Sequence, residues 1–192
     1  MTQTVLKTGF IKQANGSAYI ETEHTKIACA VWVACNSHVT QGGELDFLFS
    51  YGPRQSKSSA YHEVGRLSVE VKFTPFSSLV RRVPIRVRRL GHYGSPSFYS
   101  IIFQDAEDRT IANLVQQALT PSVRLDLLPK SVIDIFITVI ECDGIESCVA
   151  AATVATSTSL AKAGIEMLGL VVSCAGVSSS LRLCFCFLKV DC

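Results

Sequence analysis

The most constraining feature of the sequence is a run of mostly β-branched apolar residues from Ser131 to Glu141. Pro129 precedes this run and Asp143–Gly144 follows it, so it reads as a β-strand buried on both faces of a sheet. A segment rich in alanine, serine and threonine comes next and reaches Gly164. We therefore predict a strand, a tight loop and a small-residue helix that ends at a left-handed glycine.

The N-terminal part predicts a β-meander. Strands are expected at Val5–Lys12, Ser17–Thr22 and Thr25–Val33, and Asn15–Gly16 is a strong signal for a hairpin turn between the first two. Further along, apolar and polar residues alternate over Leu67–Phe73, which is typical of a half-buried strand.

The middle of the chain predicts one amphipathic helix from Asp105 to Leu119, with Asp105 as its N-cap and Pro121 just beyond its end. Val123–Leu128 is expected to form a short strand before the central run. Residues 79–104 combine five arginines with glycines, prolines and aromatic residues, and they read as a basic and aromatic loop.

Composition limits the classes of function. The chain has 192 residues, 48% of them hydrophobic, which is enough for one globular domain with its own core. Its net charge of +2 gives no overall nucleic-acid signature, so any RNA contact must come from local patches. The eight cysteines have no zinc-binding spacing, and we expect a reducing compartment, no signal peptide and no membrane span.

The predicted loop before the small-residue helix leaves two interpretations open. Backbone N–H groups at a helix N-terminus can hold an anion such as phosphate. The plainer alternative is a capped helix that packs on a sheet and binds nothing.

The amino-acid sequences of several segments resemble motifs of the RNase PH family. The resemblance rests on PKSVIDIFITVIECDG and AKAGIEMLGLVV around the central strand, on KTGFIKQANGSAYIETEHTKIACAV near the start, and on YGPRQSKSSAY and GRLSVEVKFTPFSS between them. It covers most of residues 6–32, 51–78 and 105–174 in the family's order. It implies an α+β fold, a two-layer sheet-and-helix domain with βαβ units.

Two segments depart from the family's pattern. The resemblance implies a domain over residues 1–175, with an atypical insertion at 33–50 and an atypical tail at 176–192. Because the family's usual C-terminal strand and helix are missing or replaced, we expect a C-terminally truncated domain. Both segments could derive from an intron or from alternative splicing.

Active members of the family cleave RNA by phosphorolysis, and the resemblance implies a phosphate site at Asp143–Gly144. The family's Thr/Ser and Arg positions in this loop fall on Glu146 and Ser147. A carboxylate repels phosphate, and serine cannot supply a guanidinium fork. We therefore expect a degenerate loop, no catalysis, no cofactor and no metal site.

The resemblance also implies RNA contacts by arginines that face a channel. Arg66 matches a channel-facing position best, and Arg54 lies near it in sequence. The basic loop adds further candidates, namely Arg81, Arg82, Arg86, Arg88 and Arg89. For all of them the alternative is an ordinary solvated charge.

Taken together, the resemblance predicts a non-catalytic ring subunit of the eukaryotic RNA exosome, found in nucleus, nucleolus and cytoplasm. Its partners would be other RNase PH-like ring subunits, RNA-binding cap subunits, an associated 3′-to-5′ exoribonuclease and single-stranded RNA, with no membrane. Two alternatives stay open. One is an active phosphate-dependent exoribonuclease. The other is a splice-variant product that joins no ring and exposes Leu168, Leu170 and Val172.

Overall fold

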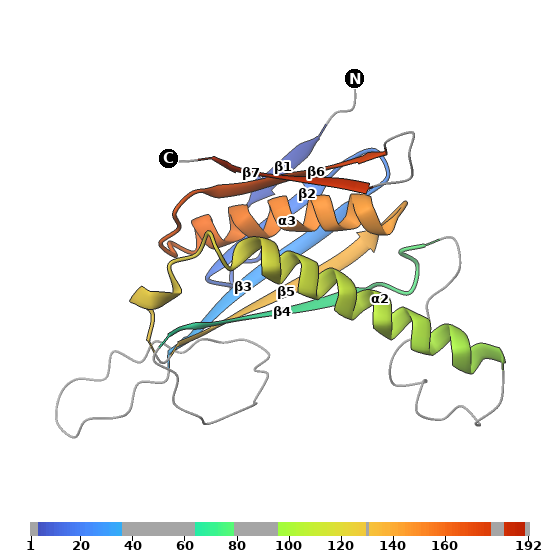
Figure 1. Cartoon of the computed structure of the whole chain (residues 1–192), viewed down its shortest axis with the longest axis horizontal. Coiled ribbons are helices and arrows are strands. Elements are labelled where there is room, and N and C mark those ends of the chain that lie inside the picture. Colours follow the sequence, from blue (N-terminus) through green and yellow to red (C-terminus); the bar gives the residue numbers. More distant parts are fainter. Residues whose placement is uncertain (1–3, 36–63, 79–95, 130, 178–182, 191–192) are drawn as a thin grey trace.

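The computed structural model describes residues 4–35, 64–78, 96–129, 131–177 and 183–190 (Figure 1). Its strands are β1 (Val5–Thr8), β2 (Gly16–Glu21), β3 (Lys26–Cys35), β4 (Arg66–Phe73), β5 (Ser131–Glu141), β6 (Leu170–Val177) and β7 (Leu183–Val190). Its helices are α2 (Pro96–Leu119), the 3₁₀ turn η1 (Leu125–Leu127) and α3 (Ile145–Lys162). None of the described helices is long and apolar enough to cross a membrane.

Five strands form one mixed sheet in the order β1-β2-β3-β5-β4. All neighbours are antiparallel except β4 and β5, which run parallel with Arg66 opposite Val132 and Phe73 opposite Val139. Because α2 connects these two parallel strands, β4-α2-β5 is the βαβ unit that the family resemblance implies. The central strand has the predicted bounds, and it lies in the interior of the sheet.

Both helices pack on the same face of this sheet (Figure 1). The β6–β7 hairpin lies on the far side of α3, so α3 is held between two sheets. The backbone N–H of Val171 donates to Ser157 Oγ over 2.9 Å, and Ser173 Oγ donates to the carbonyl of Ala150 over 2.9 Å. The α+β class is confirmed, whereas the two layers that were expected become three.

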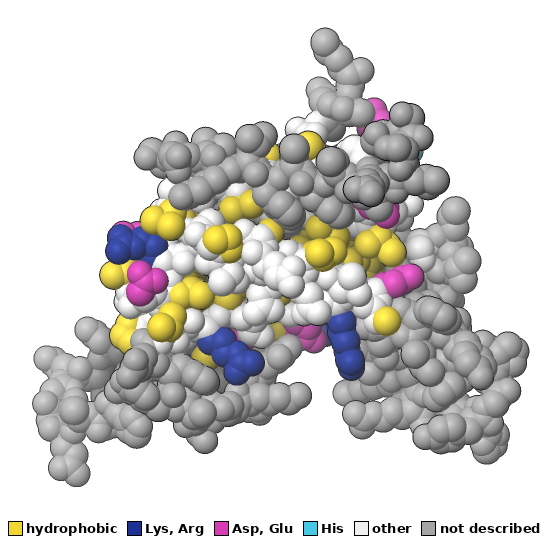
Figure 2. Space-filling model, in the orientation of Figure 1, with side chains coloured by type: hydrophobic (Ala, Val, Ile, Leu, Met, Phe, Trp, Pro, Cys, Tyr) yellow, Lys and Arg dark blue, Asp and Glu magenta, His cyan; other side chains and the backbone are white. Residues whose placement is uncertain are grey.

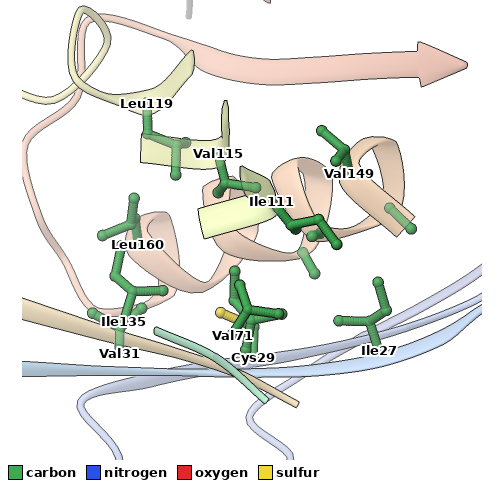
Figure 3. Close-up of a cluster of buried hydrophobic side chains, with 14 of the residues drawn as sticks. Ile27, Cys29, Val31, Val71, Ile111, Val115, Leu119, Ile135, Val149 and Leu160 are labelled. Atoms are coloured by element: carbon green, nitrogen blue, oxygen red, sulfur yellow. The ribbon is translucent and has the colours of Figure 1, made fainter. Parts of the chain in front are cut away.

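The core lies between the sheet and the two helices (Figure 3). The helix-facing residues of β5 are fully buried, namely Ile133, Ile135, Ile137 and Val139. They meet Ile111, Val115 and Leu119 of α2 and Val149 and Leu160 of α3. The opposite face of β5 is only partly covered, so the prediction of a strand buried on both faces holds for one of them.

The first strand is shorter than predicted. β1 ends at Thr8, which pairs with Ala18, so residues 9–15 form a longer connection than a two-residue hairpin turn. Gly9 has a positive φ of 74° and donates its N–H to the carbonyl of Ser17 over 2.9 Å. The glycine that sets the turn is therefore Gly9, because a positive φ strains other residues.

The helix predicted from Asp105 begins at Pro96, so Asp105 is inside α2 and cannot be its N-cap. Residues 96–104, which we assigned to the basic and aromatic loop, therefore form the first part of α2. The signal for the earlier start is Pro96 itself, since proline is favoured at the first helical position. Val123–Leu128 is also not a strand. It makes one bridge, Val123 to Met167, and then η1.

The end of α3 and the described part of the C-terminal tail both belong to the fold. Gly164 has a φ of 74°, as predicted for the glycine that ends this helix. Within the tail from residue 176, β7 pairs antiparallel with β6, with Val172 opposite Leu188 and Cys174 opposite Cys186. Residues 183–190 of the tail therefore continue the fold as a strand.

Candidate functional site

The candidate anion loop connects the end of β5 to the start of α3. Gly144 is the N-cap residue of α3, and no side chain caps this helix end. A carboxylate oxygen of Glu146 lies 3.3 Å from the position that a Cβ on Gly144 would occupy. The carboxylate is thus turned back toward the helix N-terminus, where the helix dipole favours a negative charge.

Ser147 has a structural contact in this loop. Its Oγ lies 2.9 Å from Oγ1 of Thr25, a fully buried residue just before the start of β3. The hydroxyl of Thr22 donates to the carbonyl of Thr25 over 3.1 Å. The residue at the family's arginine position therefore ties α3 to the β2–β3 turn.

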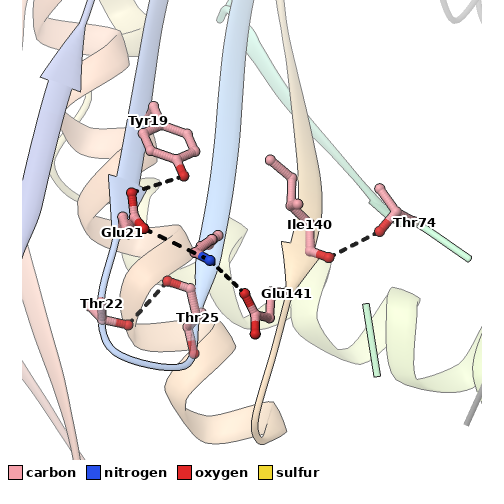
Figure 4. Close-up of polar contacts among 8 residues, drawn as sticks. Tyr19, Glu21, Thr22, Thr25, Thr74, Ile140 and Glu141 are labelled. Atoms are coloured by element: carbon pink, nitrogen blue, oxygen red, sulfur yellow. Dashed lines mark hydrogen bonds and ion pairs between the residues drawn. The ribbon is translucent and has the colours of Figure 1, made fainter. Parts of the chain in front are cut away.

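A chain of polar groups joins the ends of β2, β3 and β5 beside the loop (Figure 4). Lys26 Nζ lies 2.8 Å from a carboxylate oxygen of Glu141 and 3.8 Å from one of Glu21. The hydrogen bond between Lys26 and Glu141 raises the pKa of Lys26 and lowers the pKa of Glu141. Tyr19 donates to Glu21 over 3.2 Å, so the lysine and both carboxylates already have partners.

The charge balance around the loop is negative. Within residues 21–26 and 139–149 the acidic residues are Glu21, Glu23, Glu141, Asp143 and Glu146, whereas Lys26 is the one lysine or arginine. Like charges a few ångströms apart repel by about 1 kcal/mol or more near a protein surface. Among the described residues, this arrangement disfavours inorganic phosphate and supplies no guanidinium group beside the loop.

Arg66 lies at the other end of the sheet from the loop. It is the exposed first residue of β4 and pairs with Val132, near the start of β5, whereas the loop follows the end of β5. At about 3.3 Å per strand residue the two are roughly 30 Å apart. Gly65, just before it, is fixed to η1 by a 3.0 Å hydrogen bond to the carbonyl of Leu125.

The structure thus separates the two groups of predicted site residues. The loop residues Asp143, Gly144, Glu146 and Ser147 lie together at the start of α3, and Arg66 does not join them. Outside the described residues are the other candidates for RNA contact: Arg54, Arg81, Arg82, Arg86, Arg88 and Arg89. Their role stays a prediction.

Sequence reasoning missed the groups that support the loop from the N-terminal meander. Thr25 and Lys26 are more than a hundred residues away in sequence, and only the pairing of β3 with β5 brings them to the loop. The sequence did hold a signal for this contact, since β5 ends with the acidic residue Glu141 and β3 begins with Lys26. In the described part of the chain, no group of histidine, cysteine, aspartate and glutamate side chains could hold a metal ion.

Comparison with known proteins gives concordant results. Residues 3–166 match the RNase PH model, described as the 3′ exoribonuclease family, domain 1. Exosome complex component mtr3 of Schizosaccharomyces pombe is 34% identical over 166 residues, which are 86% of this chain and 50% of that protein. Human exosome complex component MTR3 is 33% identical over 169 residues, 88% of this chain and 52% of that protein.

More distant relatives extend the comparison. Exosome complex component Rrp41 of the archaeon Cenarchaeum symbiosum is 31% identical over 87% of this chain and 54% of that protein. The crystal structure of rice Rrp46 superposes with a TM-score of 0.55 at 17% identity, covering 95% of this chain and 67% of that one. The chain spans about half the length of the curated relatives it matches. Their names agree with the motifs, which favour the mRNA-transport-regulator-3 type within the family.

Proposed function

Because the chain belongs to the RNase PH family, we propose that it is a non-catalytic ring subunit of the RNA exosome. The role is structural: the subunit helps to build the ring and the channel that leads single-stranded RNA to a separate 3′-to-5′ exoribonuclease. The names of the mtr3 relatives support the assembly. The chemistry of the anion loop supports the lack of catalysis.

The observation that carries the non-catalytic assignment is that the side chains of the loop make structural contacts of their own. Ser147 is engaged with buried Thr25, and Glu146 turns its carboxylate toward the helix N-terminus. Phosphorolysis needs preorganised positive charge around the phosphate, and such groups usually supply several kcal/mol of catalysis. Here the start of α3 is lined by carboxylates instead.

The RNA-binding part of the proposal rests on Arg66. This side chain is exposed at the start of β4 and distant from the acidic loop, so it can meet a phosphate backbone without competing carboxylates from that loop. Such contacts bind RNA with little sequence preference. Arg54, Arg81, Arg82, Arg86, Arg88 and Arg89 are proposed to extend this contact.

The proposed partners are other RNase PH-like ring subunits, RNA-binding cap subunits and the associated exoribonuclease. The proposed location is the nucleus, the nucleolus and the cytoplasm, where such assemblies process RNA. The test is co-expression of the tagged chain with the RNase PH-like ring subunits of its own organism, followed by affinity purification at near-physiological salt. We expect a stoichiometric complex. Recovery of the folded chain without any ring subunit would reject the proposal and favour a product that does not assemble.

Catalysis is tested separately. The purified chain, alone and in the complex without the exoribonuclease, is incubated with single-stranded RNA and increasing inorganic phosphate. We expect no release of nucleoside diphosphates at any phosphate concentration. Release that scales with phosphate would establish the alternative of an active exoribonuclease, while leaving ring membership intact.

A further inference from the structure

The β6–β7 hairpin places two cysteines directly opposite each other. Cys174 of β6 pairs in register with Cys186 of β7, in an antiparallel ladder whose register is constant over the whole hairpin. Residues directly opposite in such a ladder have Cα atoms about 4.5–5.5 Å apart and share one face of the sheet. Disulfides join Cα atoms that are about 4.4–6.8 Å apart, so the register provides the distance that a cross-strand disulfide requires.

Cys174 lies on the side of the hairpin that faces away from α3. Val171 and Ser173 are buried against the helix, whereas the alternate residues Val172 and Cys174 are exposed. Ser173 fixes this orientation, because its Oγ donates to the carbonyl of Ala150 over 2.9 Å. The Cys174 thiol is free, so a small oxidant in solution can reach it.

Buried and offset cysteines are less well placed for the same bond. Cys29 is buried in the core, and burial raises the pKa of its thiol to about 11, which keeps the thiol protonated. Cys184 pairs with Gly176, two residues from Cys174, and residues offset by two along a ladder are about 7–8 Å apart. This separation exceeds the reach of a disulfide, so the register selects Cys186 as the partner of Cys174.

A bond at this position would fasten the less anchored strand of the hairpin. β6 packs on α3 and is tied to it by the hydrogen bonds of Val171 and Ser173, whereas β7 is joined to the fold mainly through β6 (Figure 1). Two-stranded sheets are marginal in water on their own. A covalent link between the strands restricts the conformations in which β7 has separated from β6, and it thereby stabilises the hairpin.

We propose that Cys174 and Cys186 form a reversible disulfide that makes the hairpin sensitive to oxidation. The oxidant is a low-molecular-weight disulfide such as glutathione disulfide. The Cys174 thiolate attacks one of its sulfurs, which forms a mixed disulfide and releases one glutathione. Cys186 then loses its proton and attacks the Cys174 sulfur, which forms the cross-strand bond and releases the second glutathione. Two protein thiols are oxidised, one small disulfide is reduced to two thiols, and the two protons pass to the released thiolates.

The bond fits the compartment that the sequence predicts. In a reducing compartment disulfides are rarely structural, and those that form are usually transient and redox-sensing. Excess reduced glutathione reverses both exchange steps, so the hairpin returns to its dithiol state once the oxidant is removed. Ring membership is not needed for this reaction, which takes place within one chain.

The test treats the reduced full chain with glutathione disulfide, once in native buffer and once in concentrated urea. Free thiols are then blocked with N-ethylmaleimide, and mass spectrometry of a digest made without reductant identifies the linked peptides. In native buffer we expect the link between Cys174 and Cys186 about tenfold more often than any other, because the register raises the effective concentration of this pair. In urea this preference should vanish. Equal link patterns in both solutions would overturn the proposal.

Three variants separate the register from the reactivity of single thiols. Cys186→Ser removes the partner, and Cys174→Ser removes the exposed thiol. The matched control is Cys184→Ser, the same exchange at the offset cysteine of β7. We expect the cross-strand link in the control alone, and a lasting mixed disulfide with glutathione on Cys174 in Cys186→Ser. A wild-type chain that links Cys174 to Cys184, or that stops at the mixed disulfide, would contradict the assigned pair. The native and urea comparison needs no substitution, so it decides even if a variant fails to fold.

Hydrogen exchange measures the effect of the bond on the hairpin. Mass spectrometry compares residues 170–177 and 183–190 in the reduced chain, in the oxidised chain and in the oxidised chain after a dithiol reductant. We expect slower exchange in the oxidised state alone, and no change in Cys186→Ser treated in the same way. Equal exchange in the reduced and oxidised chains would show that the bond does not fasten β7, and the proposed redox sensitivity of the hairpin would fail.

Discussion

At the scale of single residues, Gly16 shows how closely strand and helix approach. A Cβ at Gly16 would overlap the carbonyl oxygen of Ser159 and lie 2.8 Å from Cβ of Ala163. Neither neighbour is the end of a flexible side chain. The start of β2 therefore packs directly on the last turn of α3, and only glycine allows it.

We predict that Gly16→Ala lowers the free energy of unfolding by about 1–3 kcal/mol, the usual range for forcing a methyl group into a packed site. The control is Gly176→Ala, where nothing lies within 4 Å of the new Cβ. This control should be neutral or slightly stabilising because alanine has less backbone freedom to lose. Urea unfolding of the three proteins measures the difference. Equal midpoints for both variants would contradict the close packing.

Asp134 gives a prediction about pH. Its pKa is raised in the folded protein, by burial and then by Glu70. Between the unfolded and folded pKa values the native state holds more protons, so stability falls as pH rises through that window. Asp134→Asn removes this titrating carboxyl group. The stability of the variant relative to wild type should therefore rise from pH 4 toward neutral pH and then level off.

Chemical unfolding at a series of pH values tests this on the isolated chain. The useful quantity is how the difference in unfolding free energy between Asp134→Asn and wild type changes with pH. Its absolute value is less useful, because the asparagine amide has its own burial cost that does not depend on pH. Asp126→Asn, at an exposed residue, serves as the control. A difference that stays flat or falls with pH would show that the Asp134 carboxyl is not destabilised by ionisation in the fold.

At the scale of elements, the sequence predicted best where the signal is local. The bounds of β5 were right because β-branched residues fill the strand and Pro129 and Asp143–Gly144 flank it. The end of α3 was right because Gly164 has the left-handed conformation that only glycine adopts easily. The start of α2 was wrong because the arginines and aromatic residues before Asp105 outweighed the helix-start signal of Pro96.

Contacts between distant segments could not be predicted. The degenerate loop was recognisable from Glu146 and Ser147 at the head of a helix, but the bond from Ser147 to Thr25 depends on how β3 pairs with β5. The same holds for Val123–Leu128. Its alternating pattern suits a strand, yet the segment spans the short gap between α2 and β5 and packs Leu125 and Leu128 against the core instead.

The anchoring of α3 can be measured by a double-mutant cycle. Thr25→Ala and Ser147→Ala each remove one side of the 2.9 Å hydrogen bond between their hydroxyl oxygens. We expect each to cost about 1 kcal/mol, and the double variant to cost less than the sum, since a single bond is lost. Thermal or urea unfolding provides the free energies. Strictly additive effects would mean that the two hydroxyls do not stabilise each other.

At the scale of the whole molecule, α3 is covered on both sides, but the second sheet has two strands in the described part of the chain. Val171 and Ser173 face the helix and are buried, whereas Val172, on the alternate face, is 40% exposed and Leu168 is 51% exposed. Two-stranded sheets are marginal in water unless something packs on them. The chain also spans about half the length of its curated relatives, so in them other residues are available to cover such a surface.

This exposure predicts self-association of the isolated chain at high concentration. The double variant Leu168→Lys and Val172→Lys removes two exposed apolar side chains and adds two positive charges to a net charge of +2. It should be more monomeric in sedimentation velocity and have an unchanged unfolding midpoint, because neither side chain belongs to the core. The matched control, Asn113→Lys and Gln117→Lys on the exposed side of α2, adds the same charge without removing apolar surface. If both double variants reduce association equally, net charge is responsible, and the apolar face of the hairpin is not the surface through which the chains associate.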